Sequence, residues 1–111
     1  MKITRRQTLL AATAATAMAA LAYNVTGTVT DNQGEPLTDA TVRILAAKDS
    51  SFVKGSIADL DGNFKFTGLK NGRYLAETTY IGYNKTLTPF RISGANASLD
   101  TIRVDESSIV L

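Results

Sequence analysis

Three oxygen-bearing side chains occupy alternate positions in the middle of the chain, at Asp59, Asp61 and Asn63. Carboxylate and amide oxygens with this spacing begin a calcium-binding loop of the EF-hand kind. A complete loop also has glycine at its sixth position and a bidentate glutamate at its twelfth, whereas this chain has Phe64 and Lys70 there. A β-hairpin turn explains the same three residues with fewer assumptions. We therefore expect a turn here, and Asp59, Asp61 and Asn63 remain the calcium candidate.

The chain lacks the residues that most often serve as general bases and as thiol nucleophiles in enzymes. The 111 residues include no His and no Cys. An imidazole base, a thiol nucleophile, a thiolate zinc site and a disulfide framework are therefore all excluded. Serine residues are present, but there is no histidine to activate any of them. We expect no catalytic residue and no cofactor, and the function classes that remain are binding and structural ones.

The first 22 residues have the pattern of an export signal. The positive charges at its start are Lys2, Arg5 and Arg6. An uncharged, alanine-rich run follows and ends in small residues, which predicts cleavage between Ala22 and Tyr23. The arginine pair resembles a twin-arginine signal, and the general secretory route is equally open. Because the run is too short and too weakly apolar for a membrane span, we expect an exported domain without a span.

Removing this signal changes the charge of the protein. Three of the 12 basic residues lie in the signal, and all 10 acidic residues lie after it. The remaining domain therefore has more acidic than basic residues, although the whole chain has a net charge of +2. Nucleic-acid-binding domains usually carry a clustered basic patch. We expect no nucleic-acid partner.

The rest of the chain has the pattern of an all-β domain. Short runs rich in Val, Ile, Thr, Tyr and Phe alternate with turns that contain Gly, Asn or Asp, which indicates a sandwich or a barrel. About seven strands are predicted, at residues 23–30, 40–47, 53–58, 63–67, 73–83, 85–92 and 98–104. The longest of them is expected at 73–83. Residues 105–111 are expected to form a tail or the start of a linker.

Six short blocks within this region follow one another in a familiar order. They are Val25–Asp31, Gly34–Leu37, Ala40–Ile44, Asp59–Phe64, Leu69–Tyr74 and Tyr80–Tyr83. Together they resemble the carboxypeptidase regulatory-like domain family over residues 23–104. The resemblance implies a transthyretin-like, prealbumin-type β-sandwich. Hydrolases with transthyretin-like folds depend on histidine residues that this chain lacks, so an enzyme of that class is the disfavoured alternative.

The last of these blocks resembles one group of the family in particular. Because it has Tyr-Ile-Gly-Tyr at the end of a long predicted strand, this chain resembles the domains that precede TonB-dependent outer-membrane receptors of Gram-negative bacteria. This resemblance implies a location in the periplasm or at the outer membrane. It also implies a protein partner or a downstream β-barrel domain. A free-standing exported domain and the first domain of a larger protein both remain open.

Tyr80, Ile81 and Tyr83 are the candidate interaction residues. An exposed tyrosine ring would stack on a sugar or hold a peptide, whereas packing in the core is the structural alternative. The exposed edges of a sandwich also accept partner strands. We expect an accessory interaction module of an outer-membrane uptake system. The alternative is a secreted or surface domain that binds carbohydrate or protein.

Overall fold

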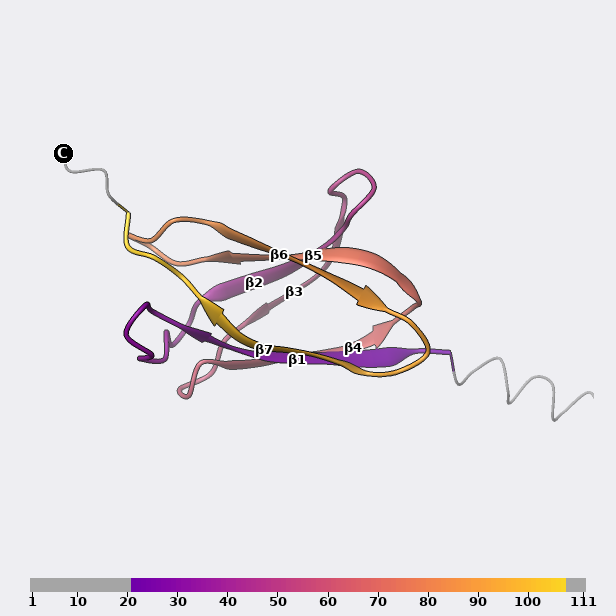
Figure 1. Ribbon diagram of the computed structural model, residues 1–111, viewed down its shortest axis with the longest axis horizontal. Helices are drawn as coiled ribbons and strands as arrows, with labels where there is room; N and C mark the ends of the chain where they lie inside the picture. The colour runs from indigo at the N-terminus through magenta and orange to yellow at the C-terminus, as the bar shows by residue number, and fades with distance from the viewer. Residues whose placement is uncertain (1–20, 108–111) are drawn as a thin grey trace, which may run out of the picture.

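The computed structural model describes residues 21–107, which fold into two β-sheets packed face to face (Figure 1). The three-stranded sheet has the order β4-β1-β7, with β1 (Tyr23–Thr30), β4 (Asn63–Leu69) and β7 (Ala97–Arg103). The four-stranded sheet has the order β3-β2-β5-β6, with β2 (Thr41–Ala46), β3 (Phe52–Ile57), β5 (Gly72–Thr79) and β6 (Thr86–Ile92). The predicted all-β sandwich of about seven strands is confirmed.

Neighbouring strands are antiparallel, except for β1 and β7, which are parallel. The β1–β2 and β3–β4 connections each cross from one sheet to the other. The two crossings lie side by side, because the Asp39 N–H donates to the Ala58 carbonyl at 3.0 Å. Within residues 21–107, no helix is long and apolar enough to cross a membrane.

The predicted export signal falls mostly outside the described residues, which begin at residue 21. Strand β1 begins at Tyr23, directly after Ala22. Cleavage between these two residues stays a prediction, and a cut there would leave the whole of β1 in the mature chain.

Apolar side chains at alternate positions of the strands fill the space between the two sheets. In β1, Val25 and Val29 are fully buried and the intervening Thr26 is exposed; in β2, Val42 and Ile44 are fully buried in the same way. Each such side chain contributes roughly 1.5–3 kcal/mol when it leaves water. The core cluster consists of Val25, Val29, Leu37, Ala40, Val42, Ile44, Ala58, Phe64, Phe66, Leu69, Ala76, Ile92, Ile102 and Val104.

The strand predicted at residues 73–83 is shorter than expected. Strand β5 ends at Thr79, because the chain turns back on itself immediately afterwards. The Tyr83 N–H donates to the Tyr80 carbonyl at 3.0 Å, and Gly82 has a φ of 85°. That left-handed conformation suits glycine at the third position of a tight turn. Tyr80, Ile81 and Tyr83 therefore lie in the turn between β5 and β6, not on a strand.

Candidate functional site

Both groups of predicted site residues lie at the same end of the sandwich, on the left in Figure 1. We call this the loop end; it comprises residues 31–40, 58–62, 80–85 and 104–107. Backbone hydrogen bonds tie its segments together. The Val29 N–H donates to the Gly62 carbonyl at 2.7 Å, and the Asn84 N–H donates to the Asp105 carbonyl at 2.8 Å. The opposite end of the sandwich carries the β2–β3, β4–β5 and β6–β7 loops.

The calcium candidate residues build the β3–β4 turn. One carboxylate oxygen of Asp59 accepts the backbone N–H groups of Asp61 and Asn63, each at 2.9 Å. The Asn63 side-chain oxygen accepts the Thr28 hydroxyl at 2.7 Å. The expected turn is present, and Asp59 stabilises it in the way that Asp commonly does. Among residues 21–107 there is no group of three or more acidic side chains placed to hold a metal ion. Calcium binding at Asp59, Asp61 and Asn63 stays a prediction.

The candidate interaction residues form a small aromatic cluster with one exposed aliphatic side chain. The rings of Tyr80 and Tyr83 meet edge to face, with centroids 5.5 Å apart, and both rings pack against the core. Ile81, at the tip of the turn, is 92% exposed. Burial raises the pKa of the Tyr83 hydroxyl, and the nearby carboxylates of Glu106 and Asp31 raise it further. A role of these residues in binding stays a prediction.

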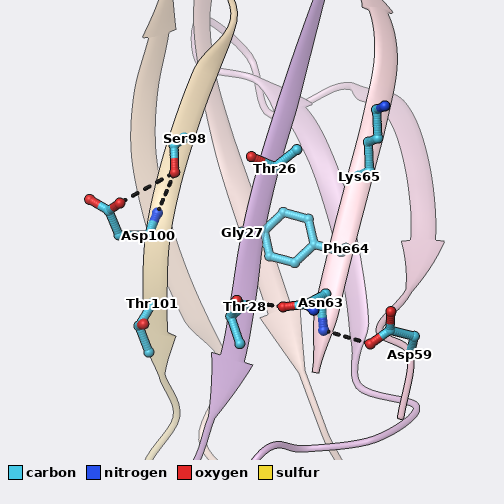
Figure 2. Close-up of a pocket in the computed structure, with 10 residues that line it drawn as sticks. All are labelled: Thr26, Gly27, Thr28, Asp59, Asn63, Phe64, Lys65, Ser98, Asp100 and Thr101. Atoms are coloured by element: carbon cyan, nitrogen blue, oxygen red, sulfur yellow. Dashed lines mark hydrogen bonds between the residues drawn. The ribbon is translucent and has the colours of Figure 1, made fainter. Parts of the chain in front are cut away.

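A polar hollow of about 610 Å³ lies on the outer face of the three-stranded sheet (Figure 2). We call it the polar hollow. Its lining consists of Thr26, Gly27, Thr28, Asp59, Asn63, Phe64, Lys65, Ser98, Asp100 and Thr101. Strand β1 runs through the middle, and β4 and β7 form the two sides (Figure 2). The sequence signal was visible in the alternating Thr26 and Thr28, but pairing with β4 and β7 is what assembles the surface.

Two features of the strands that line this hollow are distinctive. The ring of Phe64 occupies the space above Gly27, where a Cβ atom would lie 2.5 Å from the ring. Asp100 sits in an irregularity of the β1–β7 pairing with a φ of 52°, and its backbone N–H donates to the Ser98 hydroxyl at 3.2 Å. Hydroxyls, an amide and carboxylates are groups that bind polyhydroxylated or other polar ligands. The Ser98 hydroxyl donates to the Asp100 carboxylate at 3.3 Å, a contact that supplies no imidazole base.

The outer face of the four-stranded sheet carries an unexpected row of apolar residues. The strand register places one row of apolar residues across it, because Leu45 is paired with Phe52 and with Leu75, and Leu75 is paired with Pro89. We call this surface the apolar face; it consists of the row Leu45, Phe52, Leu75 and Pro89, together with Leu87 and Ile57 in the next two rows, where they are paired with Glu77 and Thr41. Leu45 is buried but lies outside the core cluster. Sequence reasoning missed this face, although Leu45 directly after the buried Ile44 breaks the alternation and was a visible signal.

Phe52 is the aromatic residue of the apolar face. Its side chain is 58% exposed, and the Arg43 guanidinium lies 5.3 Å from the centre of its ring. Arg43 also donates to the Glu77 carboxylate at 2.8 Å, which holds the guanidinium in place. An arginine fixed over an exposed ring is a cation–π arrangement at the surface of the domain.

A family model for the carboxypeptidase regulatory-like domain matches residues 24–105, which is most of the chain. The chain belongs to this family. Such regulatory-like domains are usually non-catalytic. The match begins one residue into β1 and ends just after β7, so the family region coincides with the sandwich. A search of curated proteins finds no significant match to the sequence.

Solved structures with the same fold cover nearly all of this regulatory-like domain. The major pilin subunit BcpA of Bacillus cereus aligns with a TM-score of 0.64 and 20% identity over 78% of this chain and 29% of the pilin. A type II cohesin–X-dockerin complex from Acetivibrio cellulolyticus aligns with a TM-score of 0.61 and 19% identity over 80% and 61%. The 3-chlorocatechol 1,2-dioxygenase of Rhodococcus opacus aligns with a TM-score of 0.60 and 11% identity over 78% and 60%. The domain spans less than two thirds of each of these chains, and identities this low show the fold alone.

Proposed function

We propose that this regulatory-like domain is an exported, non-catalytic interaction module that docks on a protein partner through its apolar face. The partner is a chain of an outer-membrane uptake system of the TonB-dependent type, in the periplasm of a Gram-negative bacterium. A downstream β-barrel domain of the same protein would serve equally as the partner. The single observation that carries the proposal is the exposed Phe52 ring beneath the Arg43 guanidinium.

The composition of the apolar face supports docking. A sandwich strand normally places polar residues outward, whereas here Leu87 is 50% and Ile57 is 61% exposed. Contiguous exposed apolar surface marks protein-interaction sites, and aromatic residues and arginine dominate the binding energy of such interfaces. Of the structures that share the fold, one is named as a major pilin subunit and another belongs to a cohesin–X-dockerin complex. These names support an interaction role for the fold.

The proposed location of the domain is tested by fractionating the cells that make it. An antibody against residues 23–104 would be used on separated cytoplasmic, periplasmic, outer-membrane and extracellular fractions. A band of mature size in the periplasm, or a larger band in the outer-membrane fraction, is expected, and the second result would identify a downstream domain as the partner. Detection only in the cytoplasm would overturn the exported role.

The docking face is tested by photo-crosslinking in the same cells. A photoreactive amino acid would replace Phe52 or Leu87, and Lys65 on the outer face of the three-stranded sheet is the matched control. Crosslinked products are expected from the first two positions and not from Lys65. Equal crosslinking from all three positions, or none from any, would contradict docking through this face.

The polar hollow supports a second candidate function, the binding of a carbohydrate. Its carboxylates and amide suit paired hydrogen bonds with neighbouring sugar hydroxyls. Titration with oligosaccharides, followed by the amide NMR signals of Thr26 and Ser98, tests this candidate. Shifts confined to the hollow would support it, and unchanged spectra at millimolar sugar would exclude it.

A further inference from the structure

The charges of the sandwich are separated along its length. Lys85 is the basic residue within the loop end, and Arg103 directly precedes its last segment. Seven of the ten acidic residues lie there: Asp31, Glu35, Asp39, Asp59, Asp61, Asp105 and Glu106. Lys85 lies 3.9 Å from the Glu77 carboxylate, so part of its charge is already balanced. The loop end therefore has a strong excess of negative charge.

The opposite end has an excess of positive charge. We call it the basic end; it carries Lys48, Lys70, Arg73 and Arg91, with Asp49 as its nearby acidic residue. Arg73 and Arg91 are direct partners across β5 and β6, and like charges in that position destabilise a sheet. Within residues 21–107, none of the four basic side chains is within salt-bridge distance of a carboxylate. An acidic surface placed against this end would relieve the repulsion.

The two ends also differ in form, since one carries a protruding side chain and the other a hollow. At the loop end, the β3–β4 turn presents Leu60, whose side chain is 81% exposed and is flanked by Asp59 and Asp61. At the basic end, a hollow of about 630 Å³ is bordered by the β2–β3 and β4–β5 loops. The hollow is lined by Ala46, Ala47, Lys48, Lys70, Asn71, Gly72, Arg73 and Tyr74. It thus combines apolar walls with cationic side chains, which is the complement of an exposed leucine next to the carboxylate of Asp61.

We propose that a second copy of this chain docks head to tail, with Leu60 of one copy seated in the basic-end hollow of the next. The aliphatic side chain would meet Ala47 and the ring of Tyr74, and Asp61 would lie beside the cationic side chains of Lys70 and Arg73. Such a contact uses two different surfaces, so a pair of copies still has one free loop end and one free basic end. The assembly is therefore an open chain of copies and not a closed pair. The apolar face is left free, so this contact is independent of the proposed docking on a partner.

Sedimentation velocity of the protein purified from the cells that make it tests the proposal. The weight-average mass is expected to rise with concentration at low salt. It is expected to fall back toward the monomer at high salt, because the Debye length shortens from about 10 Å at 0.1 M to about 3 Å at 1 M. Leu60→Asp, at an exposed position that contributes nothing to the core, is expected to abolish association. Monomers at every concentration and salt level would overturn the proposal.

A charge exchange distinguishes this contact from other modes of association. Asp61→Lys and Lys70→Asp would each repel their own copies and remain monomeric. A mixture of the two variants would associate again, because each acidic tip then meets a basic hollow and each basic tip meets an acidic one. Lys65→Asp makes the same charge change on the outer face of the three-stranded sheet and should associate like the wild type. Association that persists in all single variants, or a mixture that stays monomeric, would rule out the head-to-tail contact.

Discussion

At the scale of the residue, the closest fit in the sandwich is between Gly27 and Phe64. A Cβ atom on residue 27 would lie 2.5 Å from the Phe64 ring, which is 5% exposed and so has little room to move. Gly27→Ala is expected to lower the free energy of unfolding by about 1–3 kcal/mol, as overpacking in a core does. Urea denaturation measures the change. Gly55→Ala is the control, because its Cβ would make only ordinary contact at 3.4 Å. A second substitution, Phe64→Leu, should recover part of the loss in Gly27→Ala, and a purely additive double variant would contradict this explanation.

A single buried hydroxyl gives a prediction of the opposite sign. The Thr78 side chain is fully buried, and among residues 21–107 its hydroxyl has no hydrogen-bond partner. A buried polar group without a partner costs free energy that a methyl group does not. Thr78→Val is therefore expected to raise the free energy of unfolding by about 1 kcal/mol. Thermal unfolding of Thr78→Val is compared with that of Thr41→Val, at an exposed position on β2, which should change little. A destabilised Thr78→Val would mean that the hydroxyl has a partner.

At the scale of the element, the β3–β4 turn connects the two sheets at the loop end. Gly62 has a φ of 77°, and a Cβ atom there would lie 2.5 Å from the Val29 carbonyl oxygen. Gly62→Ala is expected to cost more than the roughly 1–2 kcal/mol of a left-handed conformation alone, because the turn must also move away from β1. Gly34→Ala has a similar φ of 88° but open space around it, so it should show the conformational cost only. Equal losses in the two variants, measured by urea denaturation, would contradict the close approach.

The strands and turns were largely predictable, because each depends on neighbours in the sequence. Strand β1 has the predicted bounds, since Val25 and Val29 alternate with threonines between clear turn signals. The strand expected to extend to Tyr83 ends at Thr79, because Gly82 allows a turn that alternation alone does not reveal. The polar hollow and the apolar face were not predictable. Both depend on which strands become neighbours and in what register, as with Leu45 beside Phe52 and Leu75.

At the scale of the whole molecule, the last described segment ties the two sheets together at the loop end. The Val104 N–H donates to the Thr30 carbonyl at 2.9 Å, which keeps the segment on the three-stranded sheet. The Ser107 N–H donates to the Gly82 carbonyl at 2.9 Å, and Tyr83 forms a β-bridge with Glu106, which joins it to the β5–β6 turn. Tyr83 therefore titrates in an environment that exists only when both sheets and this segment are assembled.

This dependence predicts how stability changes at alkaline pH. Burial first, and then Glu106 and Asp31, raise the pKa of Tyr83 above the value of about 10 that an unfolded chain has. As the pH rises past that value, the unfolded chain loses the proton before the folded one, so stability falls until the folded pKa is also passed. Tyr83→Phe removes the titrating group and should flatten this part of the decline, while Glu106→Gln should bring the Tyr83 pKa closer to its ordinary value. Tyrosinate absorbance and urea denaturation between pH 9 and 12 would measure both effects. An alkaline decline of the same steepness in the wild type and in Tyr83→Phe would mean that Tyr83 is not held in place by the segment that follows β7.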